Sequence, residues 1–187
     1  MIESHLGGHM NRTHCDVGAL ECVINYDNTI VRMLDIGCGP GGMSEIAEKN
    51  GLSWVGIDGD VDVIAGKNNT IVHDFRWPYI WETIDYEPDL IWSVEFLEHI
   101  DEEYLHNVMK VISRAKYALV TAAPPGYPGH HHVNCRAQEY WIGVFSGYGL
   151  KFNSIMTQNV RMKSTMHKPF MQATGMFFNN MKVKCHD

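Results

Sequence analysis

Hydrophobic and polar residues follow two different periods along this chain of 187 residues. Short apolar runs rich in β-branched residues predict strands, whereas longer segments with apolar residues three to four positions apart predict helices. The predicted strands span residues 29–36, 53–58, 70–75, 88–94 and 117–123, with two weaker strands at 150–156 and 175–183. The predicted helices span residues 42–51, 61–67, 102–114 and 137–149.

Strands and helices alternate from residue 29 onward, which is typical of a parallel sheet covered by helices on both faces. We therefore predict an α/β fold: a Rossmann-like, doubly wound sheet that is mostly parallel and has an antiparallel last strand. Ligands of such sheets bind beyond the carboxyl ends of the strands, so functional residues are expected there. Residues 1–28 precede this pattern, and the polar, glycine-containing composition of residues 1–15 is also compatible with a flexible leader.

Composition and charge narrow the possible classes. Hydrophobic residues make up 45% of the chain and charged residues 20%, as in ordinary globular proteins, and the length suits one domain. A formal net charge of -7 argues against a large nucleic-acid interface. No apolar run approaches the roughly 18 residues of a membrane span, and the N-terminus lacks signal-peptide features. Five scattered cysteines without a CxxC pair argue against disulfides or a zinc ribbon and favour a cytoplasmic location.

A glycine-rich segment with the sequence LDIGCGPGG begins at the end of the first predicted strand. Gly37, Gly39 and Gly42 match the spacing GxGxxG, and glycines there let the backbone approach a ligand closely. A tight turn without a ligand would have the same spacing. Asp35 occupies a position where a dinucleotide site would prefer an apolar residue, and its carboxylate suits a cationic group such as an amine or a sulfonium.

Two further carboxylates stand at the ends of the next two predicted strands. Asp58 ends the strand at residues 53–58, where a ribose diol would need a bidentate acceptor. Asp74 follows in residues 70–75, where it could accept a hydrogen bond from an adenine amino group with Phe75 against the ring. One ligand with a cationic part, a ribose and an adenine is S-adenosylmethionine.

Four segments of the chain, LDIGCGPGG, GID, HDF and DLIWSVEFLEHI, resemble in this order the motifs of class I S-adenosylmethionine-dependent methyltransferases. The resemblance covers roughly residues 29–149. It implies contacts with the methionine part, the ribose and the adenine, and a strand end running beneath the cofactor. The cofactor-binding residues implied are Asp35, Gly37, Cys38, Gly39, Asp58, Gly59, Asp60, Asp74, Phe75, Ser93 and Val94.

The N-terminal segment departs from this family pattern. The usual helix before the first strand is short or replaced by a leader rich in glycine and histidine, with His5, His9 and His14. We therefore expect residues 1–28 to form a lid or substrate segment over the cofactor. The methyltransferase domain would then span residues 29–187.

A cluster of ionisable residues, EFLEH, follows the strand predicted at residues 88–94. If a helical turn starts there, Glu95, Glu98 and His99 project from one face. Two carboxylates and an imidazole could form half of a site for Mg²⁺ or Mn²⁺. A solvated helix start, with acids favoured by the helix dipole, would have the same residues.

The segment GHHHVNC places His130, His131 and His132 after the strand predicted at residues 117–123, at the same edge of the sheet. His131 or His132 could complete a Glu, Glu, His, His set, and we select Glu95, Glu98, His99 and His131 as the metal ligands. The set resembles the metal site of small-RNA 3′-end 2′-O-methyltransferases, and partly that of ubiquinone-pathway O-methyltransferases. A metal there would bind adjacent oxygens of a diol and lower the pKa of the attacking hydroxyl.

Other interpretations of this cluster remain open. Without a metal, His99, His131 or His132 would act as general base for an oxygen or nitrogen acceptor. The histidines could also make only local hydrogen bonds in a rigid loop. We predict methyl transfer to an oxygen of a small-molecule or sugar-like acceptor, without nucleic-acid or membrane partners and with the oligomeric state open. A nicotinamide-dependent oxidoreductase and a non-catalytic S-adenosylmethionine-binding subunit are the rivals.

Overall fold

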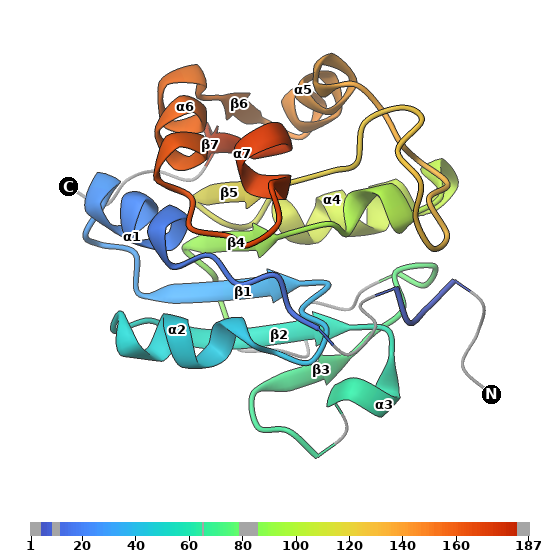
Figure 1. Ribbon diagram of the computed structural model, residues 1–187, viewed down its shortest axis with the longest axis horizontal. Coiled ribbons are helices and arrows are strands. Elements are labelled where there is room, and N and C mark those ends of the chain that lie inside the picture. The colour runs from blue at the N-terminus through green and yellow to red at the C-terminus, as the bar shows by residue number, and fades with distance from the viewer. Residues whose placement is uncertain (1–4, 9–11, 65, 79–85, 183–187) are drawn as a thin grey trace.

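The computed structural model describes residues 5–8, 12–64, 66–78 and 86–182. Seven strands form one sheet in the order β3-β2-β1-β4-β5-β7-β6 (Figure 1). The strands are β1 (Arg32–Ile36), β2 (Ser53–Asp58), β3 (Thr70–Val72), β4 (Leu90–Ser93), β5 (Tyr117–Val120), β6 (Leu150–Phe152) and β7 (Met176–Asn180). The helices are α1 (Val17–Tyr26), α2 (Met43–Lys49), α3 (Val61–Ile64), the 3-10 turns η2 (Leu97–His99) and η3 (Glu102–Tyr104), α4 (Leu105–Ile112), α5 (Gln138–Gly147), α6 (Ser154–Lys163) and α7 (Phe170–Thr174).

The pairing of the strands confirms the predicted fold class. β1 pairs in parallel with β2 and β4, β2 with β3, and β4 with β5. β7 runs antiparallel to both of its neighbours, β5 and β6. The arrowheads of the parallel strands therefore point to one edge of the sheet, and residues 5–8 lie beside that edge (Figure 1).

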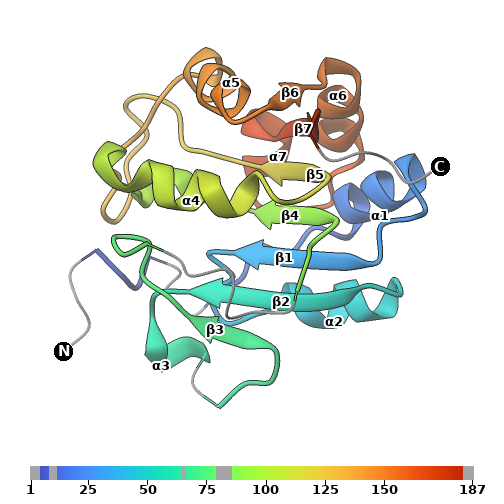
Figure 2. The same cartoon turned by 180° about the vertical axis from the view of Figure 1, so that it is seen from behind.

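Helices cover both faces of the sheet, as predicted. Figure 1 looks onto α1, α2, α6 and α7, and Figure 2 onto α4 and α5. Successive residues of β1 serve the two faces: Met33 packs in the core beneath α1, α2, α6 and α7, and Leu34 in the core beneath α4 and α5. Among the described residues, no helix combines the length and the apolarity needed to cross a membrane; a cytoplasmic location stays a prediction.

Three helices, α1, α6 and α7, were not predicted from the sequence. Residues 17–26, expected only as part of the leader, form α1, whose buried residues Ala19, Leu20 and Val23 join the core. The strand predicted at residues 150–156 stops at Phe152, and its second half is the first turn of α6. Of the residues used in the predictions, His9, Ala65 and Val183 lie outside the described part of the chain.

Asp16 connects the segment before α1 to the loop after α6. Its fully buried carboxylate caps α1 by accepting a hydrogen bond from the Ala19 amide at 3.0 Å. The same carboxylate accepts bonds from the Thr165 amide at 2.8 Å and from the Ser164 hydroxyl, both in the loop after α6. The Gly18 amide donates to the Thr165 hydroxyl at 3.0 Å. The segment before α1 is therefore fixed to the loop between α6 and α7.

Replacing Asp16 should destabilise the fold. Asp16→Ala removes a helix cap and leaves buried donors without an acceptor, so we expect the free energy of unfolding to fall by about 2–4 kcal/mol. Urea unfolding followed by circular dichroism measures this, with Asp62→Ala, at an exposed carboxylate, as the control. Equal unfolding midpoints for the two variants would show that Asp16 does not bind the two segments together.

Candidate functional site

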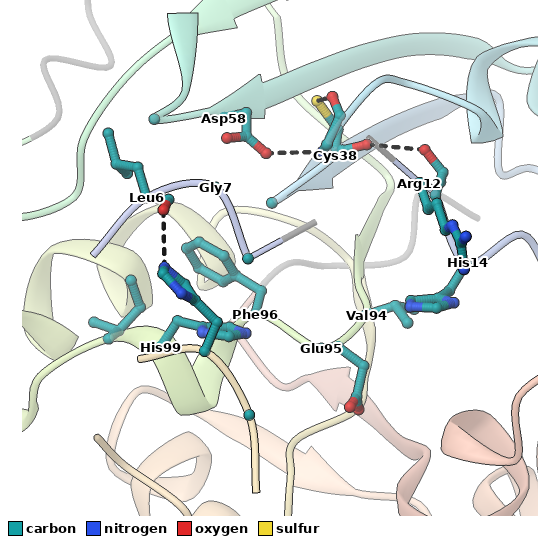
Figure 3. Close-up of a pocket in the computed structure, with 18 of the residues that line it drawn as sticks. Leu6, Gly7, Arg12, His14, Cys38, Asp58, Val94, Glu95, Phe96 and His99 are labelled. Carbon is teal, nitrogen blue, oxygen red and sulfur yellow. Dashed lines mark hydrogen bonds between the residues drawn. The ribbon is translucent and has the colours of Figure 1, made fainter. Parts of the chain in front are cut away.

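A pocket of about 320 Å³ opens at the carboxyl edge of the parallel strands. Five parts of the chain build it: the glycine-rich loop after β1, the residues after β2 and β3, the segment from β4 through η2, the loop after β5, and the N-terminal residues (Figure 3). Nine of the eleven predicted cofactor-binding residues line it: Asp35, Gly37, Cys38, Gly39, Asp58, Gly59, Asp74, Phe75 and Val94.

The glycine-rich loop contains three glycines with positive φ, of which Gly37 and Gly39 lie at the pocket. Gly37 has φ +73°, and a β-carbon there would lie 2.5 Å from the ring of Phe96, so a larger residue would not fit. Gly39 has φ +51°, and its amide donates to the carboxylate of Asp58 at 2.7 Å. The loop is thereby bound to the end of β2, and its backbone forms one wall of the pocket.

Asp35 presents an almost fully buried carboxylate to this wall, since its residue is only 3% exposed. The Trp54 indole donates to it at 3.3 Å. Burial raises the pKa of Asp35 to about 7; the Trp54 hydrogen bond opposes this rise, and the charge of Asp58 adds to it. A cationic ligand group would stabilise the ionised form, so the site suits an ammonium or sulfonium.

Asp60 and Ser93 do not line the pocket. Asp60 is buried and accepts from the Asp62 amide at 2.9 Å at the start of α3. The Ser93 hydroxyl donates to the Ile36 carbonyl at 3.0 Å and links β4 to β1. Both residues thus support neighbouring parts of the site from within the fold.

Asp74 lines the pocket but already has several partners. The Arg76 side chain donates to Oδ2 at 2.8 Å, and the Arg76 amide donates to Oδ1 at 2.9 Å. His5 Nε2 lies 3.1 Å from Oδ2. Burial opposes ionisation, but the Arg76 bonds outweigh it and lower the pKa of Asp74. Because each carboxylate oxygen has two lone pairs, Oδ1 keeps room to accept from a ligand.

Glu98 is the most unusual ionisable residue of the site. Its side chain is fully buried in η2, and neither carboxylate oxygen has a partner at full hydrogen-bond geometry among the described residues. The nearby amides of Glu98 and Ala123 only partly favour its ionised form. Burial, together with the charge of Glu95, raises the pKa of Glu98 well above its ordinary value. Burial also raises the pKa of Glu95, against the opposing hydrogen bond from Thr121 at 2.8 Å. Two carboxylates therefore sit together in a poorly solvated place.

Two histidines approach Glu98. Ligand atoms of Glu98, His99 and His132 lie within 4.8 Å of one another, close enough to hold a metal ion. His132 Nδ1 lies 3.0 Å from the Tyr127 carbonyl, a contact that leaves Nε2 as the nitrogen able to accept or ligate. Burial, followed by the positive charge of His132, lowers the pKa of His99 to about 4, so its ring is neutral at physiological pH.

His131 faces away from this cluster. It has φ +47°, and its Nε2 lies 3.9 Å from the Asp101 carboxylate. The geometry therefore brings His132, rather than the selected His131, together with Glu98 and His99. The neighbouring His130 bonds through Nε2 to the Leu6 carbonyl at 3.0 Å.

Residues 5–8 cross the mouth of the pocket. His5 reaches Asp74, and Leu6 packs so closely against Gly59 that a β-carbon there would lie 2.6 Å from the Leu6 side chain. At the other end, a β-carbon on Gly8 would lie 3.2 Å from the His99 ring. This strap thus touches both the predicted cofactor residues and the histidines.

A family model for the methyltransferase domain matches residues 13–127. The chain belongs to this family. The sheet order and the glycine-rich loop agree with that assignment, and the predicted enzyme class, an S-adenosylmethionine-dependent methyltransferase, is confirmed. No curated protein matches the sequence significantly.

Solved structures share the fold of this methyltransferase. One is a SAM-dependent methyltransferase from Archaeoglobus fulgidus, with 20% sequence identity, a TM-score of 0.57, and coverage of 72% of this chain and 67% of that one. A TehB-like SAM-dependent methyltransferase from Corynebacterium glutamicum has 19% identity, a TM-score of 0.61 and 87% coverage of both chains. The methyltransferase domain of bacterial CtHen1 has 15% identity, a TM-score of 0.58, and coverage of 87% and 96%.

Several residues of the site carry no clear sequence signal. Trp54 reaches Asp35 because β1 and β2 pair with Met33 opposite Trp54. This register of the two strands cannot be read from the sequence. The Thr13 hydroxyl accepts from the Gly42 amide at 2.9 Å and so holds the N-terminal segment on the glycine-rich loop. Such contacts depend on tertiary structure, and only the predicted strand order could have suggested the first.

Replacing Asp35 should raise the stability of the ligand-free protein and lower its affinity for the cofactor. The folded carboxyl has a raised pKa, so the methyltransferase loses stability as the pH rises from about 4 through about 7. In Asp35→Asn this loss is absent, and the ligand-free variant should be more stable than wild type by on the order of 2 kcal/mol at pH 8 but not at pH 4. Its affinity for S-adenosylhomocysteine should fall about tenfold or more, because the ammonium loses its charged partner.

Thermal unfolding at both pH values and titration calorimetry measure the two effects. Asp62→Asn serves as the control for an exposed carboxylate. An Asp35→Asn variant with the pH profile and the affinity of wild type would rule out this role for Asp35.

Proposed function

We propose that this methyltransferase transfers the methyl group of S-adenosylmethionine to an oxygen of a small-molecule or sugar-like acceptor, assisted by a divalent metal. The proposed ligands are Glu95, Glu98, His99 and His132. One observation carries the proposal: the fully buried Glu98 carboxylate has no partner at full hydrogen-bond geometry among the described residues, yet lies beside two imidazoles.

The energetics of the cluster support a cation. A buried carboxylate without a partner costs several kcal/mol, and a second carboxylate beside it adds repulsion. A divalent ion would remove both penalties. Carboxylate and neutral imidazole donors suit Mg²⁺, Mn²⁺ or a similar ion, and His99 is neutral at physiological pH.

Each part of the pocket then has a task. We assign Asp35 to the ammonium of the cofactor, Asp58 to its ribose, and Asp74 with Phe75 to its adenine. The bound cofactor supplies an electrophilic methyl group, and a divalent ion supplies positive charge that lowers the pKa of an acceptor hydroxyl. The chain contributes mainly the positioning of the two reactants.

A metal-free mechanism is the second candidate. His99 is buried, neutral and lines the pocket, so it could accept the proton of an acceptor hydroxyl. However, a pKa of about 4 makes it a weak base, since general bases work best with a pKa near the operating pH. Ligation uses the same neutral ring without that disadvantage, which favours the metal.

We also propose that residues 5–8 act as a lid over the cofactor. The strap already contacts Asp74 and Gly59 on the cofactor side and the His99 ring on the other. The contact of His5 with Asp74, the bond between His130 and the Leu6 carbonyl, and the packing of Leu6 lie at the partly exposed mouth of the pocket, where local opening is least costly.

Removal of the metal or of one ligand should abolish turnover and leave cofactor binding intact. We expect excess chelator to stop methyl transfer and added Mn²⁺ to restore it. Glu98→Gln should lose Mn²⁺ binding in titration calorimetry and lower kcat by about a hundredfold or more, the scale of a lost metal role. Glu48→Gln, at an exposed carboxylate, is the control. Full activity in excess chelator would refute metal assistance and leave the histidine base.

Deletion of residues 1–8 should weaken cofactor binding. The lost contacts correspond to about 1.4 kcal/mol, so the dissociation constant of S-adenosylhomocysteine should rise about tenfold. Calorimetry on this variant, compared with a deletion of residues 183–187 at the other end of the chain, measures the effect. Unchanged affinity and turnover would show that the strap is not a lid.

A further inference from the structure

A second hollow, of about 460 Å³, adjoins the cofactor pocket. It lies between the segment before α1 and the loop joining α6 to α7, and it shares Arg12, Thr13 and His14 with the first pocket. We call it the basic pocket because four of its eight lining residues carry basic side chains: Arg12, His14, His167 and Lys168. The other four are two threonines, a cysteine and a methionine, so the lining includes no carboxylate.

This concentration of positive charge stands out in a chain of net charge -7. Within the part of the chain that the structure describes, none of the four basic side chains forms an ion pair. Two of them act on a third: burial, followed by the charges of Lys168 and Arg12, lowers the pKa of His14. An anion placed among them would replace repulsion by attraction.

Specific contacts hold the two segments that form the walls of the basic pocket. Asp16 fixes the segment before α1 to the amide of Thr165, as described above. Thr13 holds the same segment on the glycine-rich loop, and the His14 ring packs edge-on against Phe170 at 4.8 Å between centroids. These contacts hold the two segments that carry the four basic residues side by side; Arg12, His167 and Lys168 are exposed to solvent, and His14 is half-buried.

The position of the basic pocket relates it to the reaction. Figure 3 shows Arg12 and His14 across the cofactor pocket from Leu6 and His99, on the side of Val94. Glu95 lines the cofactor pocket as well. A molecule with its hydroxyl at the proposed metal ligands could thus extend toward Arg12 and His14.

We propose that the basic pocket binds an anionic group, a phosphate or a carboxylate, carried by the methyl acceptor. This inference rests on the proposed function for the identity of the molecule, but not for the anion site itself. It narrows the acceptor to a hydroxyl compound with a negative charge away from the methylated oxygen. The cations would orient the acceptor and contribute to its affinity through charge-assisted hydrogen bonds.

Inorganic phosphate tests the site without any turnover. In protein with labelled histidine, the NMR titration of the His14 ring is followed in phosphate and in chloride at equal ionic strength. We expect phosphate to raise the His14 midpoint by about half a pH unit or more, because a bound anion favours the imidazolium. The double variant His167→Gln, Lys168→Gln, at two residues that line only the basic pocket, should lose this response, whereas Lys49→Gln, at an exposed lysine paired with Glu45, should keep it.

Cofactor binding distinguishes the acceptor from the obvious competitor, the carboxylate of the cofactor itself. The phosphate response should persist in saturating S-adenosylhomocysteine, and the double variant should bind that ligand within about twofold of wild type. No phosphate response, or a response abolished by S-adenosylhomocysteine, would overturn the proposal. Since neither measurement involves a metal or methyl transfer, its failure is separate from any failure of the proposed function.

Discussion

The parallel pairing of β2, β1, β4 and β5 is the constraint on which the site depends. Parallel strands all end at the same edge, so residues distant in sequence meet there. In this chain those residues include several acids, among them Asp35, Asp58, Glu95 and Glu98. Their proximity and burial raise the pKa values of Asp35 and Glu98. The fold thus creates an edge that positively charged ligands stabilise.

Local sequence patterns were sufficient to predict the central part of the fold. The run at residues 53–58 is β2 to the residue, because Gly51 before it and the acidic turn after it bound an apolar segment. The sequences of the helices that were not predicted lack such a clear pattern. In α6 the buried Met156 and Val160 have helical spacing, but the exposed Ile155 and Met162 obscure it. Tertiary packing against α1, rather than the pattern, stabilises that helix.

The choice among the three histidines shows where prediction of the site had to stop. His130, His131 and His132 are adjacent, and strand order places all of them at the correct edge. Which ring reaches Glu98 depends on the backbone: the positive φ of His131 turns its ring toward Asp101 and leaves His132 with the cluster. The positive φ of Glu95 could not be predicted either. Positive φ is expected mainly at glycine, and neither Glu95 nor His131 is a glycine.

The segment before α1 and the loop after α6 add positive charge, which the ends of the parallel strands do not supply. Because Asp16 connects the segment before α1 to the loop after α6, the basic residues Arg12, His14, His167 and Lys168 stand next to the acidic edge. Opposite charges are thus kept apart on one rigid frame rather than neutralised in ion pairs. A cofactor that is cationic and an acceptor that is anionic would each meet its complement there, and their own attraction would favour the approach of the two reactants.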